Sequence, residues 1–127
     1  MKLELIKREN PINREVVKFY PHVVNEGVAE LKDLAKQVTK YSSLSTGDVI
    51  SVLENMVDAA AIYLLMGKGV RIGRLGMLRI SVQSTGADTP EAFNTKMIRR
   101  VKLIFTPSVD FKKELEGVSF EVVRDDS

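Results

Sequence analysis

The stretch that decides the fold is residues 45–72, which read STGDVISVLENMVDAAAIYLLMGKGVRI. Ser45 and Asp48 have the spacing of a capping box, in which each side chain accepts a hydrogen bond from the other residue's backbone amide. They predict a helix that runs to Met66 and ends at Gly67, because a glycine commonly follows the last helical turn. Apolar residues cover well over half of this helix, whereas an ordinary surface helix has one apolar stripe. We therefore expect its own chain to cover one side and a second copy to cover the other.

Two strands and a helix are predicted before this stretch. Residues 2–9 alternate between apolar and charged side chains, which is the two-residue period of a half-buried strand. Residues 16–24 are β-branched and aromatic, and Pro21 within them indicates an edge strand or a bulge, because proline cannot donate a ladder hydrogen bond. From about residue 29, apolar residues recur every three or four positions up to Tyr41, which predicts an amphipathic helix.

Three strands, a short helix and a last strand are expected after this stretch. Residues 70–72, 77–83 and 100–105 alternate like strands, and the turn-rich residues 84–95 predict the tip of a long hairpin. Thr106 is expected to cap a helix over residues 107–115, with Pro107 in its first position. Residues 118–123 alternate again and would pair with residues 2–9, and residues 125–127 would form a frayed tail.

The composition indicates one α+β domain over residues 1–127. Within it we expect a strand extension (1–27), a core (28–115) and a terminal strand with a tail (116–127). Because the chain has no cysteine and one histidine, His22, disulfides and thiolate metal sites are excluded and a multi-histidine site is not expected. Residues 1–10 are charged throughout and no apolar run approaches the length of a membrane span, so we expect a cytoplasmic protein.

Basic residues cluster in the middle of the chain, although the net charge is only +2. Between Lys68 and Lys102 there are eight basic and two acidic residues, while the remainder has eleven basic and fifteen acidic residues. A basic segment inside an otherwise acidic chain favours a surface for a polyanion. A solvated sheet face is the alternative, and the spacing of the charges alone does not separate the two.

The strand phases place four of these cations together. If the apolar residues of the three central strands face the helices, the two-residue period fixes which residues lie on the opposite face. These are Arg71, Arg79, Arg100 and Lys102. The strands contain no acidic residue, and Lys96 and Arg99 lie further along the hairpin. Such a face is suited to a phosphate backbone, and each neutralised phosphate would add to the salt dependence of binding.

Other candidate sites have simpler explanations. Residues 67–73 are glycine-rich, but they follow a helix and precede a strand, which is the reverse of a phosphate-cradling loop. Glu54 and Asp58 lie one helical turn apart and could flank a metal ion. Two carboxylates without further ligands, however, indicate a solvated stripe on the helix. No nucleophile–base pair or metal cluster is visible, so an enzyme, a cofactor and a small-molecule substrate are not expected.

Residues 28–115 combine two helices, a three-stranded sheet with a long hairpin and a short terminal helix. This order, with LSTGDV (44–49), GKGVRI (67–72), LGML (75–78) and FTP (105–107), resembles the HU and integration host factor family of bacterial histone-like DNA-bending proteins. The extension before this core and the strand after it are similar to the longer HU-related variant abundant in Bacteroidetes.

The resemblance implies an intertwined homodimer that places paired sheets on double-stranded DNA and two hairpin arms in the minor groove. Pro90 at the arm tip would wedge between base steps. We expect a largely sequence-nonspecific nucleoid-associated protein of the cytoplasm, with no membrane partner. The candidate DNA-binding residues are Arg71, Arg74, Arg79, Lys96, Arg99, Arg100, Lys102 and Pro90.

The arm departs from the family pattern. Residues 81–87 carry no basic residue, Asp88 and Glu91 flank Pro90, and Thr106 stands where the family's Phe-Lys-Pro segment has a lysine. These differences predict weaker and strongly salt-dependent DNA binding. They also motivate a second hypothesis, that the chain is an HU-fold protein-interaction or structural module that has lost DNA bending.

Overall fold

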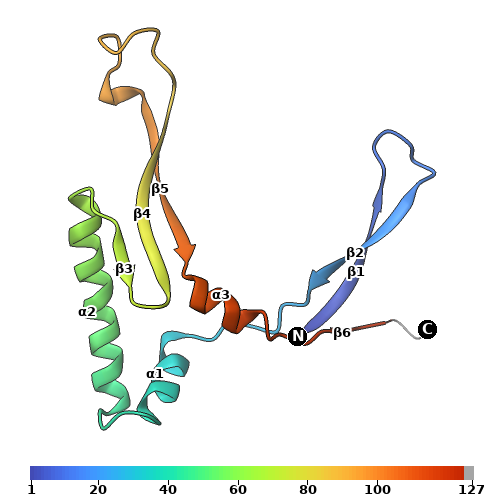
Figure 1. Ribbon diagram of the computed structural model, residues 1–127, viewed down its shortest axis with the longest axis horizontal. Coiled ribbons are helices and arrows are strands. Elements are labelled where there is room, and N and C mark those ends of the chain that lie inside the picture. The colour runs from blue at the N-terminus through green and yellow to red at the C-terminus, as the bar shows by residue number, and fades with distance from the viewer. Residues whose placement is uncertain (125–127) are drawn as a thin grey trace. The chain divides into compact units, whose positions relative to one another are not determined.

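The structure is a computed structural model that describes residues 1–124 (Figure 1). Its contacts divide the chain into two compact units. The central unit is Ala29–Glu114, and the terminal unit combines Met1–Val28 with the residues from Leu115 onward. The predicted single domain stays a prediction, because compact units of contacts need not be units that fold independently. The tail predicted at residues 125–127 lies outside the described residues.

The central unit begins with two helices, α1 (Leu31–Thr39) and α2 (Thr46–Leu65). The predicted capping box is confirmed at the start of α2. The Asp48 amide donates to Ser45 Oγ at 3.1 Å, and the Ser45 amide donates to Asp48 Oδ2 at 3.4 Å. Gly67 has a φ of 82°, the left-handed conformation that ends the helix. None of the helices among residues 1–124 has the length and apolar composition needed to cross a membrane.

The sheet of the central unit has the order β3-β4-β5, with β3 at Val70–Ile72, β4 at Gly76–Ser84 and β5 at Ile98–Pro107. Both pairings are antiparallel, and Val70 and Phe105 each lie opposite Leu78. One sheet face is therefore apolar and adjoins α2. The hollow between them, about 230 Å³, is lined by Met56, Val57, Ala60, Ala61, Leu64, Ile72, Leu78 and Leu103.

The β4–β5 hairpin extends well beyond β3 (Figure 1). Its register shifts once, since Gln83 lies opposite Arg100 but Ser84 lies opposite Ile98. Arg99 is thus the additional residue of a β-bulge, a feature that bends a strand and increases its twist. Beyond the bulge, a single 3₁₀ turn (η1, Thr95–Met97) and a loop form the predicted hairpin tip.

Within one chain the central unit buries little apolar side chain. Ala35 and Val49 are the buried hydrophobic residues of the described chain, and Val57, Val101 and Leu103 are each more than 60% exposed. On α2 itself, Val52, Val57 and Ile62 are each more than half exposed, so its own chain leaves apolar residues of this helix uncovered, and their covering by a second copy stays a prediction.

Three predicted helix ends are wrong. The first helix is two residues shorter at each end than predicted, beginning at Leu31 and ending at Thr39. The last helix, α3, spans Val109–Leu115 and does not begin at Pro107. Thr106 does not cap it, because Thr106 and Pro107 continue β5 opposite Met77 and Gly76. Ser108 caps the helix instead, and its Oγ accepts from the Phe111 amide at 3.1 Å and donates to the Arg74 carbonyl.

The terminal unit is a second three-stranded sheet, with the order β2-β1-β6. Its strands are β1 (Lys2–Glu9), β2 (Val17–Val23) and β6 (Glu121–Val122). β1 and β2 form an antiparallel hairpin, and β2 is an edge strand, as Pro21 predicts. The predicted pairing of the last strand with residues 2–9 is confirmed, and it is parallel: Lys2 lies opposite Glu121 and Leu3 opposite Val122. This strand is shorter than the predicted 118–123.

Candidate nucleic-acid interface

Four cations lie on the face of the β3-β4-β5 sheet that points away from α2. The register pairs Arg71 with Met77. Met77 and Arg79 are two residues apart on β4, so their side chains project to the same face. The register also pairs Lys102 with Ser81 and Arg100 with Gln83, and directly paired residues of antiparallel strands project to the same side. Strand alternation therefore places all four on one face, which we call the basic face. Its cations are Arg71, Arg79, Arg100 and Lys102.

No carboxylate neutralises the basic face from within its own sheet. The three strands contain no aspartate or glutamate, and the residues opposite Arg79, Lys102 and Arg100 are Ile104, Ser81 and Gln83. The ion pairs found among residues 1–124 do not include any of the four cations. All four side chains are exposed, so the face presents a concentrated positive charge to solvent.

Gln83 is a residue of this face that the sequence reasoning did not single out. Its Oε1 accepts a hydrogen bond from Arg100 Nε at 2.8 Å. The bond occupies one of the five N–H donors of the guanidinium and leaves the terminal nitrogens for a ligand. Gln83 therefore orients Arg100 without neutralising it. Its place two residues after Ser81 in the same alternation was a signal that it shares this face.

Arg74 lies beside the basic face and differs from its four cations in having an acidic partner. It occupies the turn between β3 and β4, and its Nη1 donates to Glu114 Oε1 at 3.1 Å. Both side chains are more than half exposed, so the pair contributes little stability. Arg74 lines a hollow together with Arg71, one of the four cations, but an acidic partner already faces Arg74.

The other predicted site residues lie along the β4–β5 hairpin. Arg99 is the bulge residue and Lys96 lies in η1, where its amide donates to Asn94 Oδ1 at 2.9 Å. Pro90 is exposed in the turn at the tip, between Asp88 and Glu91. The Ala92 amide donates to the Thr89 carbonyl at 3.2 Å and fixes the shape of this turn. The tip thus presents Pro90 with carboxylates beside it, whereas the cations lie nearer the sheet.

Other kinds of site find no support in the described residues. No group of three or more histidine, aspartate or glutamate side chains among residues 1–124 is arranged to hold a metal ion. His22, on β2, is exposed, and its Nδ1 lies 3.6 Å from Glu4 Oε1 on the neighbouring strand. Glu54 and Asp58 are exposed on α2.

Comparison with known proteins places the chain in a family. A family model described as "HU domain fused to wHTH, Ig, or Glycine-rich motif" (HU-HIG) matches residues 1–122. The chain belongs to the HU-HIG family. The match covers the strands of the terminal unit as well as the central unit. The additional strands of this HU-HIG chain therefore belong to the region that the family model describes. The resemblance to HU proteins that the sequence motifs indicated is confirmed, and no curated protein matches the chain.

Two solved structures share the HU-HIG chain's fold. One is a candidate bacterial DNA-binding protein from Bacteroides vulgatus ATCC 8482, with a TM-score of 0.64 and 13% identity over 96% of this chain. The HU-HIG chain spans 48% of that protein's length. The other is Anabaena HU in a cocrystal with DNA, with a TM-score of 0.54 and 13% identity, covering 71% of this chain and all of that one. At this identity the likeness concerns the fold, and the predicted HU-like α+β fold with extra terminal strands is confirmed.

Proposed function

We propose that this chain is a dimeric, largely sequence-nonspecific DNA-binding protein of the nucleoid type that acts in the cytoplasm without catalysing a reaction. The observation that carries the proposal is the basic face, with four exposed cations on one sheet face that contains no carboxylate. Membership of the HU-HIG family and the shared fold with Anabaena HU, which was crystallised with DNA, support it. Phosphate contacts supply most of the affinity of nonspecific DNA binding.

The proposed dimer follows from the apolar surface that one chain leaves uncovered. The hollow between α2 and the sheet is open, and side chains on both of its walls are more than 60% exposed. Exposed apolar surface of this kind marks a protein interface. A second copy of the chain would supply an equivalent α2 to cover it, and pairing two copies would double the number of cations available to the same duplex.

The basic face determines how strongly binding should depend on salt. If each of its four cations neutralises one phosphate, the slope of log K against log salt concentration is about −3.6 for one copy and about −7 for a dimer. Replacing Arg100 and Lys102 by alanine would halve both values. The paired change Lys112→Ala and Lys113→Ala, on α3, removes the same charge without touching the basic face.

The test is a fluorescence-anisotropy titration of a mixed-sequence duplex with the full chain at several salt concentrations. We expect the slope of the Arg100→Ala, Lys102→Ala variant to be shallower by about 1.8 for each copy that contacts the duplex, which is half of the basic face's contribution, and the α3 variant to match the unmodified chain. A folded protein that does not bind DNA at low salt would refute the proposal. An unchanged slope in the basic-face variant would show that this face is not the contact.

The second candidate function is a protein-interaction module on the same fold. It is favoured by the tip of the β4–β5 hairpin, where Asp88 and Glu91 flank the exposed Pro90 and would repel phosphates. Crosslinking from this tip distinguishes the candidates. Recovery of a protein partner, together with DNA binding that does not respond to loss of Arg100 and Lys102, would support the module.

A further inference from the structure

The β1–β2 hairpin of the terminal unit repeats, on a smaller scale, the two-faced character of the central sheet. Its register pairs Arg8 with Lys18 and Ile6 with Tyr20, so these four side chains share one face. The other face carries mainly apolar residues, among them Leu5 and Phe19. Residues 7–18 contain four basic and two acidic residues, and the basic ones are Lys7, Arg8, Arg14 and Lys18.

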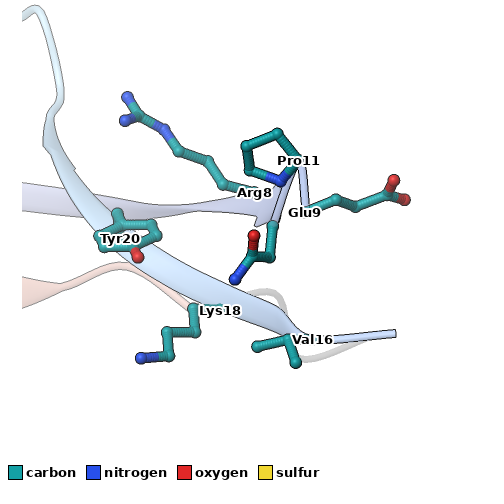
Figure 2. A pocket seen from close by; sticks show the side chains of 7 residues that line it. Arg8, Glu9, Pro11, Val16, Lys18 and Tyr20 are labelled. Atoms are coloured by element: carbon teal, nitrogen blue, oxygen red, sulfur yellow. The ribbon is translucent and has the colours of Figure 1, made fainter. Parts of the chain in front are cut away.

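The cross-strand pair Arg8 and Lys18 costs the hairpin stability. Like charges directly opposite each other on neighbouring strands repel. Both side chains are exposed, and neither takes part in an ion pair within the described chain. The Arg8 guanidinium carbon instead lies 5.5 Å from the centre of the Tyr20 ring, which holds the side chain over β2 (Figure 2). Arg8 and Lys18 thus leave paired positions of the two strands, point in different directions and present two exposed positive charges to an anionic ligand (Figure 2).

A fixed turn presents an apolar side chain at the end of this hairpin. Asn10 Oδ1 accepts hydrogen bonds from the amides of Ile12, at 2.9 Å, and Asn13, at 3.4 Å. The Asn10 amide donates to the Val16 carbonyl at 3.0 Å and closes the loop. Ile12 is 96% exposed, and Pro11 beside it is exposed as well. The turn therefore holds an apolar tip in solvent next to the Arg8 and Lys18 pair.

We propose that the β1–β2 hairpin is a second DNA-binding element, in which Arg8 and Lys18 bind phosphates of a duplex and Ile12 enters the minor groove. Apolar wedges such as isoleucine and proline, flanked by cations, are the means by which proteins unstack base steps and bend DNA. Arg8, Lys18 and Tyr20, together with Glu9, line an open hollow of about 440 Å³ (Figure 2), and we expect a sugar–phosphate strand to lie there. This inference rests on the proposed DNA-binding function and adds a contact outside the central unit.

The charges at the tip of the β1–β2 hairpin favour its entry into DNA over that of the β4–β5 hairpin. The tip of the β4–β5 hairpin presents Pro90 between Asp88 and Glu91, whose charges oppose entry into a groove lined by phosphates. At the β1–β2 tip the nearest carboxylates, Glu9 and Glu15, are outnumbered by four cations. Glu9 lies in the opposite alternation phase from Arg8 and Lys18 on the strands, although it also lines the hollow that they line.

The first test measures the phosphate contacts with the full chain and a mixed-sequence duplex. The paired change Arg8→Ala and Lys18→Ala should make the slope of log K against log salt shallower by about 1.8 for each copy that contacts the duplex, because each phosphate contributes about 0.9. The matched control Lys32→Ala and Lys36→Ala removes the same charge from exposed positions of α1 and should leave the slope unchanged.

The second test measures bending, by energy transfer between dyes at the two ends of the duplex. Ile12→Asn should abolish the bend attributed to this hairpin, and the conservative Ile12→Leu should keep it. Because the chain contains no cysteine, Ile12→Cys supplies a single thiol for an iron chelate, which should cleave the duplex in its minor groove. Circular dichroism of each variant shows that the hairpin changes leave the fold intact.

The outcomes separate the two proposals. The Arg8 and Lys18 variant could bind with an unchanged salt slope while the slope of the Arg100 and Lys102 variant becomes shallower by the expected amount. That result would refute the hairpin proposal and support DNA binding by the basic face. If Ile12→Asn bends DNA as well as the unmodified chain, the wedge is refuted. If the unmodified chain does not bind DNA, both proposals are refuted together.

Discussion

Val57 offers the most direct test of the proposed dimer. It lies on α2, lines the hollow that Leu78 and Leu103 also line, and is 61% exposed in one chain. Replacing it by alanine removes two carbons from the proposed interface. Because alanine is the best helix former, the change does not weaken α2 itself. Any effect on association therefore reports on burial against a second copy.

The magnitude follows from the exposed fraction of Val57. Two carbon groups are worth about 1.6 kcal/mol when fully transferred out of water, at about 0.8 kcal/mol each. Scaled by the 61% that one chain leaves exposed, the loss is at most about 1 kcal/mol per copy. A symmetric dimer contains the change twice, so its free energy of association falls by about 2 kcal/mol, which corresponds to an approximately 30-fold weaker dimer.

Sedimentation equilibrium over a range of protein concentrations measures the dissociation constant of the dimer directly. The control is Val28→Ala, which changes a valine that is 75% exposed and does not line the hollow, and it should not alter the dimer constant. An unmodified chain that sediments as a monomer at every concentration would refute the dimer. An unchanged constant for Val57→Ala would show that the two copies meet through another surface.

Three further predictions concern a helix cap, a close backbone contact and the arm tip. Ser45→Ala removes the acceptor for the Asp48 amide and should lower the free energy of unfolding by about 1 kcal/mol in urea denaturation, whereas an unchanged midpoint would contradict a role for the cap. Gly76→Ala should destabilise the fold by about 3 kcal/mol or more, measured in the same way. Gly76 has a φ of 149°, and a Cβ there would lie 2.8 Å from the Phe105 ring and closer still to the Thr106 carbonyl oxygen. Asp88→Asn with Glu91→Gln should tighten DNA binding about fivefold at low salt if the tip approaches phosphates, and an equal affinity would place the tip away from the duplex.

The features that the sequence predicted well are those set by neighbouring residues. The capping box depends on residues three positions apart, and the end of α2 depends on the conformational freedom of Gly67. The common face of Arg71, Arg79 and Lys102 depends only on the two-residue period of strands. None of these features needs a distant contact, so the local pattern was sufficient.

The features that the sequence did not predict depend on distant partners. Thr106 and Ser108 can both cap a helix, and the choice is made by Gly76 and Met77, which hold Thr106 and Pro107 in the sheet. The ion pair of Arg74 depends on a glutamate 40 residues away in the sequence. The bulge at Arg99 arises from the way β4 and β5 pair with each other, so the sequence of one strand does not predict it.

The parallel pairing of β1 with β6 affects the order in which the chain acquires its structure during synthesis. The central unit is continuous in sequence, so all of its residues are available before translation reaches β6. The sheet of the terminal unit, in contrast, cannot be completed until Glu121 and Val122 have left the ribosome. At about 5–20 residues per second, the nascent β1–β2 hairpin waits roughly 5–20 s for its third strand. During that interval the edge of β1 that β6 later occupies lacks its hydrogen-bonding partner and can pair with other strands.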